Sequence, residues 1–409
     1  MSLTGSQQQT FLRLLSELRP HWRREAGLPA RIQSLLAGRR AFGSRDRRLY
    51  RELIYTTLRY LPWIEPLLDS EPDKAAGVAA WLSADTPATQ AFRATATAGW
   101  PPCPGRLAEK AALLGDRIAP NHPFGLPLPD WFRAHCPEAF GAAEADALLA
   151  RAPLWVRLQR GDGQRAMEAF AATGWAGQRS EILPSAFKLP AEAEVAKSEA
   201  YRDGEIEIQD LGSQLILASV GLEPGTSWLD ACAGAGGKTL QLAQLLGPAG
   251  RVDAHDIRAD ALAELRQRAQ RAALQNITTL SAPSDHSYDG VLVDAPCSGT
   301  GTWRRSPHLK WATTPAQIEA FATRQRALLQ DFSRRVRPGG RLVYATCSLS
   351  RRENAEVLAS FLAANPDFSP APFANTFGFV PQNGGFTILP ARHDTDGFFV
   401  ASLRRAENR

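Results

Sequence analysis

From Thr226 onward, short apolar runs alternate with stretches of helical periodicity, and three of the runs end in chemically active residues. Ser227–Asp230 ends on a carboxylate and leads into a glycine-rich loop. Val291–Asp294 ends on a carboxylate and is soon followed by Cys297, and Leu342–Thr346 is followed directly by a second cysteine. Alternating strands and helices are typical of a parallel sheet, whose strands present functional groups at their carboxyl ends. The sequence therefore predicts an α/β domain with one active site at these ends.

The alternation predicts five strands and a closing hairpin. We expect strands over 227–230, 251–255, 277–280, a run ending at Asp294, and a run that follows a turn at Pro338-Gly339-Gly340 and ends near Thr346. Helices are expected over 239–246, 259–273, 315–336 and 353–364, and residues 386–389 with 398–403 could form a terminal antiparallel hairpin. In a doubly wound sheet the fourth and fifth strands are neighbours. Cys297 and Cys347 should then face one crevice.

The residues before this domain have a different texture. Residues 6–70 carry apolar residues at helical spacing, and Pro62 should end or kink a helix. Four prolines between 118 and 129 indicate a linker, and strand-like runs at 154–158 and 182–189 flank a helical stretch at 164–173. We therefore predict an all-α domain over 1–120, a linker with a small α/β segment over 121–200, and the Rossmann-like domain over 201–409.

Composition bounds the class of protein. The chain has 409 residues, 44% hydrophobic and 22% charged, which is ordinary for a globular protein with a full core. No apolar run approaches the roughly 20 residues that a membrane span needs. The amino terminus lacks the basic-then-apolar layout of a signal peptide. We expect a cytoplasmic monomer.

The five cysteines are widely spaced and include no CxxC pair. A zinc site and a disulfide framework are therefore not expected, and we predict no metal. Cys103 and Cys136 are best interpreted as small buried apolar residues. Cys232, Cys297 and Cys347 instead follow predicted strand ends.

Positive charge is concentrated near the amino terminus. The net charge is +5, and the segment 11–60 contains Arg13, Arg19, Arg23, Arg24, Arg31, Arg39, Arg40, Arg45, Arg47, Arg48, Arg51 and Arg59. A solvated helix surface is one interpretation. A face that contacts nucleic-acid phosphates is favoured, because the arginine fork matches phosphate oxygens.

The first strand end predicts a cofactor site. The loop that follows contains Cys232, Ala233, Gly234, Ala235, Gly236, Gly237 and Lys238. Glycines let the backbone approach a ligand, and the helix amino terminus adds positive potential. Asp256 follows about twenty residues later, where a carboxylate commonly binds ribose hydroxyls. Together they indicate an adenosine-containing cofactor, whereas the loop lacks the glycine spacing of an ATPase P-loop.

The two later cysteines predict nucleophilic chemistry. A single cysteine at a strand end could simply pack in the core, but two cysteines at neighbouring strand ends favour a functional role. A thiolate is a soft nucleophile suited to addition to an electron-poor ring carbon. Asp294 could bind the polar edge of that ring.

These residues carry a resemblance to a known family. The segments Asp294–Gly301, Ala345–Ser348 and Asp230–Thr239 are similar to motifs of the Sun/Nop (Fmu) family of RNA cytosine-C5 methyltransferases. The similarity continues in 209–214, 307–311 and 396–401, and so covers about residues 200–403. More weakly, residues 45–59 resemble the NusB-like helical domain of the bacterial 16S rRNA members.

The resemblance implies a reaction and roles. The cofactor would be S-adenosylmethionine, held by Cys232 to Lys238, Asp256 and Asp294. Cys347 would add to C6 of the cytosine, Cys297 would assist removal of the C5 proton, and Asp294 would also contact the base. The substrate would be RNA, 16S rRNA by the resemblance of the helical domain.

Two departures and three alternatives remain. The family loop has Ala-Pro where this chain has Gly234-Ala235, and the acidic residue usual after the third strand is absent near Ser281. Within the class, transfer RNA is an alternative substrate. A DNA cytosine-C5 methyltransferase would use Cys297 as the nucleophile and leave Cys347 without a purpose. A catalytically inactive RNA-binding protein would not need both thiols.

Overall fold

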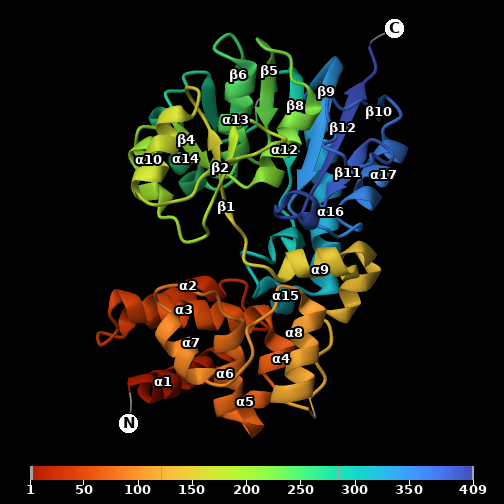
Figure 1. The fold of residues 1–409 in the computed structure, drawn as a ribbon. Helices are drawn as coiled ribbons and strands as arrows, with labels where there is room; N and C mark the ends of the chain where they lie inside the picture. The colour runs from red at the N-terminus through yellow and green to blue at the C-terminus, as the bar shows by residue number, and fades with distance from the viewer. Residues whose placement is uncertain (1–2, 121, 284, 408–409) are drawn as a thin grey trace. The chain divides into compact units, whose positions relative to one another are not determined.

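The computed structural model describes residues 3–120, 122–283 and 285–407, and the chain forms two compact units (Figure 1). The helical unit comprises Met1–Arg151 together with Trp303–Pro315. The sheet unit comprises Ala152–Thr302 and Ala316–Arg409. Compactness does not test which segments fold alone, so domain boundaries at residues 120 and 200 stay a prediction.

The helical unit consists of short amphipathic helices. These are α1 (Leu3–Leu18), α2 (Leu28–Gly38), α3 (Ser44–Arg59), α4 (Leu61–Ile64), α5 (Leu67–Ser70), α6 (Pro72–Leu82), α7 (Gln90–Ala96), α8 (Leu107–Leu113), α9 (Ala142–Leu149), α15 (Leu309–Ala312), the π-helical turn η1 (Leu114–Ile118) and the 3₁₀ turns η2 (Asp130–Ala134) and η3 (Pro137–Phe140). Phe11, Leu14 and Leu18 of α1 are buried, as their spacing predicts. Pro62 lies in the first turn of α4 just after α3 ends, which confirms the predicted interruption.

Residues 303–315 complete the core of the helical unit. The Nζ of Lys310 donates to the carbonyl oxygens of Arg59 at 2.7 Å and Pro127 at 3.3 Å. The indole of Trp311 donates to the carbonyl of Leu58 at 2.6 Å. Burial, reinforced by the charge of Arg59, holds the pKa of Lys310 well below its usual value. A segment that follows the Cys297 loop in sequence is thus locked into the helical unit.

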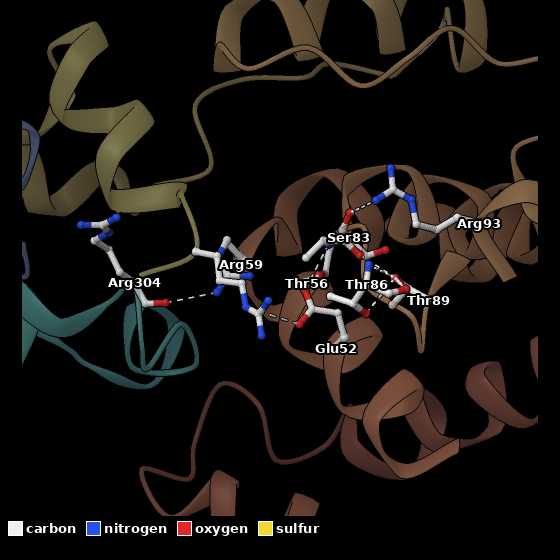
Figure 2. A network of polar contacts seen from close by, with 10 residues as sticks. Glu52, Thr56, Arg59, Ser83, Thr86, Thr89, Arg93 and Arg304 are labelled. Carbon is white, nitrogen blue, oxygen red and sulfur yellow. Dashed lines mark hydrogen bonds and ion pairs between the residues drawn. The ribbon is translucent and has the colours of Figure 1, made fainter. Parts of the chain in front are cut away.

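Arg59 joins this segment to α3. Figure 2 shows its side chain between Glu52 and Arg304. Its Nη2 donates to the carbonyl of Arg304 at 3.1 Å, and burial lowers the pKa of its guanidinium. Although Arg59 belongs to the basic segment 11–60, it is buried and does not contribute to a surface for phosphate.

The sheet unit begins with a small antiparallel sheet in the order β2-β3-β1-β4. Its strands are β1 (Leu154–Leu158), β2 (Gln178–Arg179), β3 (Ala186–Leu189) and β4 (Ile206–Ile208), with helices α10 (Gln164–Ala172) and α11 (Glu199–Arg202) and the turn η4 (Val195–Lys197). The strand at 154–158 and the helix from 164 are confirmed. Of the extended run 182–189, only the last four residues are strand.

The large sheet has the order β10-β12-β9-β8-β5-β6-β7, and β11 pairs with β12. Its strands are β5 (Ser227–Asp230), β6 (Arg251–His255), β7 (Ile277–Leu280), β8 (Tyr288–Asp294), β9 (Val336–Thr346), β10 (Phe368–Pro370), β11 (Gly385–Ile388) and β12 (Phe398–Arg405). Strands β5 to β9 pair in parallel, and β12 is antiparallel to β9, β10 and β11. The Rossmann-like sheet, the adjacency of the fourth and fifth strands and the terminal hairpin are all confirmed.

Helices cover both faces of this sheet. They are α12 (Leu211–Val220), α13 (Gly237–Leu246), α14 (Ala259–Arg271), α16 (Pro315–Ser333), α17 (Ala355–Ala364) and α18 (Pro390–His393), with the turn η5 (Thr300–Thr302). Leu292 and Val343 pack in one cluster with α12 and α13, whereas Val291 and Tyr344 pack in another with α16 and α17. Burial on both faces explains why these strands are apolar runs.

One predicted turn is wrong. Pro338-Gly339-Gly340 lies inside β9, and the pairing of β9 with β8 shifts register between Tyr288 and Gly290. Gly339 has a φ of 74°, which a residue with a side chain adopts rarely. The segment therefore forms an irregularity of the bulge type within a continuous strand.

Candidate active site

A cavity of about 720 Å³ is lined by residues that follow the carboxyl ends of β5, β6, β8 and β9. The predicted residues that line it are Cys232, Ala233, Gly234, Ala235, Gly237, Lys238, Asp256, Asp294, Cys297 and Cys347. Helix α16 adds Arg324, Leu328 and Phe332, and β12 adds Phe398. The structure thus gathers thiols, carboxylates and a lysine in one cavity.

Gly236 is the predicted site residue that does not line the cavity. It precedes α13 with a φ of 92°. A Cβ at this position would lie 2.7 Å from the Cγ of Leu265. Gly236 is therefore required by the turn and by packing against α14, and a ligand contact there stays a prediction.

Asp256 fixes the glycine-rich loop. Its Oδ2 accepts from the Gly234 amide at 2.9 Å and from Arg258 Nη2 at 3.1 Å. Its Oδ1 accepts from the Arg258 amide at 2.9 Å and from Arg258 Nε at 3.0 Å. Burial opposes ionisation, but these donors outweigh it and hold the pKa of Asp256 below its usual value. A carboxylate has about four acceptor sites, so a ribose hydroxyl would have to replace the exposed Arg258 side chain.

Asp230 is a buried carboxylate beneath the same loop. Its Oδ2 accepts from the hydroxyl of Thr239 at 2.7 Å, and its Oδ1 has no hydrogen-bond partner among the described residues. Burial raises its pKa to about 7, with the nearby Asp294 charge acting in the same direction. An apolar run that ends on a carboxylate was the signal for Asp230, as it was for Asp294.

Lys238 and Asp294 form an ion pair inside the cavity. The Nζ of Lys238 donates to Asp294 Oδ2 at 2.8 Å, and the two side chains are 10% and 28% exposed. Burial opposes the charge on Lys238, but Asp294, and to a lesser extent Cys347, outweigh burial and raise its pKa. The lysine also lies over the ring of Phe398, with Nζ 5.6 Å from the ring centroid. The sequence assigned Lys238 to the cofactor loop, whereas the structure places its ammonium beside Asp294.

The sulfur atoms of Cys297 and Cys347 lie 3.2 Å apart. Both cysteines are free thiols, and each follows the end of one of two parallel neighbouring strands. The hydrogen bond with Cys347, together with burial, raises the pKa of Cys297 well above that of an ordinary thiol. Lys238 interacts electrostatically with Cys347. Of the two thiols, Cys347 is therefore the one that interacts with the positive charge of Lys238.

Cys232 has a different environment from the other two thiols. It packs partly buried against the cluster that contains Ala231, Ala322 and Phe332. Burial, followed by the charge of Asp230, raises the pKa of its thiol far above the usual value. Cys232 therefore remains neutral and lines the cavity as a small apolar residue.

Comparison with known proteins identifies the family. The profile of the family described as 16S rRNA methyltransferase RsmB/F matches residues 217–404. A probable ribosomal RNA small subunit methyltransferase B from Synechocystis is 32% identical over 68% of this chain and 67% of that protein. The chain belongs to the RsmB/F family. The corresponding probable methyltransferase of Bacillus subtilis is 30% identical over 68% of this chain. The chain spans 66% of that relative's length, just under two thirds.

A solved structure shares the fold of this RsmB/F chain. The crystal structure of NSun6 from Pyrococcus horikoshii with SFG matches with a TM-score of 0.61 and 20% identity, over 69% of this chain and 98% of that one. At this identity the likeness shows the fold alone. Methyltransferases of the RsmB/F family use S-adenosylmethionine as methyl donor.

The cavity fits such a cofactor. Loop residues 232–235 and 237 line it, and the amino terminus of α13 supplies positive potential. Asp256 stands at the end of the neighbouring β6 and is ionised. None of the described residues between β7 and β8 lines the cavity. The sequence likewise lacks the acidic residue that the family carries near Ser281.

Several cavity residues escaped the sequence analysis. Arg258 belongs to no motif, although its place two residues after Asp256 allows it to bind that carboxylate. Phe398 lies in the 396–401 motif, which carries the RsmB/F resemblance but was given no role. Arg324 comes from α16, where no local pattern separates a cavity-lining side from a solvent side.

The described part of the chain contains neither a membrane-spanning helix nor a cluster of metal-binding side chains. None of its helices combines the length and apolar character of a membrane span. It also holds no group of three or more His, Cys, Asp or Glu side chains arranged for a metal ion.

Proposed function

We propose that this RsmB/F protein methylates C5 of a cytosine in 16S rRNA through a covalent bond between Cys347 and C6. The observation that supports this most is the thiol pair, 3.2 Å apart, in one cavity with the Lys238–Asp294 ion pair. A single thiol could serve packing. Two thiols at adjacent strand ends, with the glycine-rich loop lining the same cavity, fit a reaction that needs one nucleophile and one proton-transfer group.

The residues divide the reaction as follows. Cys347 Sγ adds to C6, so a carbon–sulfur bond forms and C5 becomes nucleophilic. Asp294 accepts a hydrogen bond from the amino edge of the cytosine, the donor that a carboxylate recognises. When bound, S-adenosylmethionine supplies the electrophilic methyl group. Cys297 then assists removal of the C5 proton, the ring double bond re-forms, and the bond to Cys347 breaks.

The electrostatics favour Cys347 over Cys297 as the nucleophile. The thiolate is the reactive form of a cysteine, and the negative charge of Glu353 acts on Cys297. Lys238 places a positive charge near Cys347 instead. This placement of charge supports the RNA-type assignment over the DNA-type alternative, in which Cys297 would attack first.

The substrate is part of the proposal. Relatives are named as small-subunit rRNA methyltransferases, and the chain spans just under two thirds of the first of them. The direct test incubates the protein with labelled S-adenosylmethionine and 16S rRNA, transfer RNA or DNA, followed by nucleoside analysis. We expect 5-methylcytidine in 16S rRNA. Label in transfer RNA alone would show that transfer RNA is the substrate in place of 16S rRNA. Label in a nucleoside other than 5-methylcytidine would refute methylation of cytosine C5.

Asp256→Ala is expected to weaken binding of S-adenosylmethionine about 10- to 100-fold by calorimetry, because a charged hydrogen bond contributes about 1.5–3 kcal/mol. The matched variant is Arg258→Ala, which keeps the carboxylate and frees its acceptor sites. We expect Arg258→Ala to bind the cofactor at least as tightly as the wild type. Equal affinity of folded Asp256→Ala and wild type would exclude Asp256 from the site.

Two sets of arginines in segment 11–60 have different surroundings. Four form ion pairs within the helical unit: Arg19 with Asp69, Arg23 with Glu65, Arg31 with Glu25 and Arg39 with Glu17. Arg45, Arg48 and Arg51 are exposed at intervals of three residues on α3. This set places three exposed arginines along one helix and is therefore the better candidate for phosphate contact.

A triple variant in which glutamine replaces Arg45, Arg48 and Arg51 is expected to bind RNA more weakly. The slope of log affinity against log salt concentration should become shallower by about 2, because each lost phosphate contact removes about 0.7. The matched control replaces Arg19, Arg23 and Arg31 and should change the slope less. Methylation of a short oligonucleotide at saturation should be nearly unchanged. Equal slopes for both triple variants would remove α3 from the RNA interface. Charge variants are preferable to deletion of residues 1–120, which would uncover Lys310 and Trp311.

A further inference from the structure

Glu353 is a buried carboxylate directly behind the thiol pair. It lies six residues after Cys347, just before α17 begins, and its side chain is fully buried. It does not line the cavity. A buried carboxylate is costly unless donors surround it, so its contacts indicate what it holds in place.

The contacts of Glu353 reach both thiol loops. Its Oε1 accepts from the Ser298 amide at 2.8 Å and from Gln325 Nε2 at 3.1 Å. Its Oε2 accepts from the Ser348 hydroxyl at 2.6 Å and from the Ser298 hydroxyl. Ser298 follows Cys297 and Ser348 follows Cys347 in sequence. One carboxylate thus binds the residue after each thiol.

Other hydrogen bonds extend this connection. Gln325 of α16 also donates to the carbonyl of Pro296 at 2.9 Å, so the Cys297 loop is held on both sides of the cysteine. The Gly301 amide donates to the carbonyl of Cys347 at 3.0 Å. The carbonyl of Glu353 itself accepts from the hydroxyl of Tyr344, which lies on β9. The two loops are therefore fixed to each other and not only to their own strands.

We propose that Glu353 is a positioning residue that sets the distance between the sulfur atoms of Cys297 and Cys347. Its importance for catalysis rests on the proposed function, in which one thiol must add to the base and the other must act on the same ring. A misplacement of about 1 Å can cost about 100-fold in rate. A carboxylate that merely stabilised the fold would have no particular reason to bind the residue after each thiol.

Thiol–disulfide exchange with glutathione reports how closely the two thiols are held together, and it needs neither RNA nor S-adenosylmethionine. One glutathione disulfide oxidises Cys297 and Cys347 to an intramolecular disulfide and is reduced to two glutathione thiols. The sulfurs must approach from 3.2 Å to the roughly 2.05 Å of a disulfide bond. The equilibrium gives the effective concentration of one thiol at the other, quantified by mass spectrometry of the linked peptides.

Glu353→Ala is expected to lower this effective concentration at least 10-fold, because the Ser298 amide loses its acceptor and the loops separate. Glu353→Gln should stay within about 3-fold of the wild type, because its amide oxygen can accept from Ser298 and the serine hydroxyls can accept from its amide nitrogen. The control is Asp253→Ala, which removes another fully buried carboxylate on β6, bound by Arg251 and Tyr288. It should destabilise the fold without changing the thiol equilibrium.

Unchanged effective concentration in Glu353→Ala would overturn the proposal, as would an equal loss in Asp253→Ala. If Glu353→Ala does not fold, Ser348→Ala removes one of the contacts and should lower the effective concentration about 3-fold; no change there would overturn it equally. In methylation assays, Glu353→Ala should lower kcat about 100-fold at unchanged KM for RNA. If Glu353→Ala lowers the effective thiol concentration but the wild-type protein methylates no RNA, the proposed function is refuted and the positioning role stays intact.

Discussion

Cys347→Ala is expected to abolish methyl transfer and to leave no covalent protein–RNA complex, because it removes the atom that we propose attacks C6. Loss of a covalent nucleophile costs other enzymes up to roughly 10⁶-fold in kcat, and we expect at least roughly 10⁴-fold here. The target base must leave its stack before the thiol can reach it. Activity should therefore be measured on single-stranded or loop substrates.

Cys297→Ala should have the opposite signature. In the proposed mechanism Cys297 acts after the methyl group is in place, when the C5 proton must leave before the bond to Cys347 can break. The variant should accumulate on RNA as a complex that survives denaturing electrophoresis. Cys103→Ala, a thiol of the helical unit, is the matched control and should behave as the wild type. A complex that accumulates with Cys347→Ala instead would reverse the roles, and normal activity in both variants would make the thiols structural.

Asp294→Asn should lower kcat by about 100-fold or more, because it weakens the proposed recognition of the cytosine edge and removes the counter-charge of Lys238. It should also destabilise the sheet unit. Breaking a buried pair costs about 3–5 kcal/mol, and we expect about 2 kcal/mol here because Asp294 is 28% exposed. Thermal unfolding of the variant checks this second effect separately from activity.

Asp289→Asn is the matched control for this variant. Asp289 lies near the start of β8, at the end of the strand opposite Asp294, and pairs with Arg337 at 2.6 Å. It should lose some stability and keep its kcat. If Asp294→Asn loses no more activity than Asp289→Asn, Asp294 does not contact the reacting base.

The strands were predictable because the sheet is buried on both faces. Runs such as Val291-Leu292-Val293 are continuous in apolar character, and each ends where its polar residue meets the cavity. Parallel pairing then fixes which ends are neighbours, so the proximity of Cys297 and Cys347 followed from topology. The Pro338-Gly339-Gly340 segment misled because the same residues form a turn or an irregular strand, and only pairing with β8 decides between them.

Features that depend on distant partners were not predictable. Lys310 donates to the carbonyl of Arg59, 251 residues away, and no local pattern places the segment 303–315 in the helical unit. Glu353 shows no signature in sequence, because its function depends on Ser298, which is 55 residues away. Counting arginines between 11 and 60 likewise overlooked Glu65 and Asp69, which lie outside that window and bind two of them.

Bisulfite sequencing of 16S rRNA from cells with and without the gene tests the central claim most directly. Bisulfite deaminates cytosine but leaves 5-methylcytosine unchanged, so the assay reports the chemistry and the position together. We predict at least one 16S rRNA cytosine that resists conversion only when the gene is present, and that loses resistance when Cys347 is replaced with alanine. Identical conversion of all 16S rRNA cytosines in both strains would contradict the assignment of this RsmB/F protein as a 16S rRNA cytosine-C5 methyltransferase.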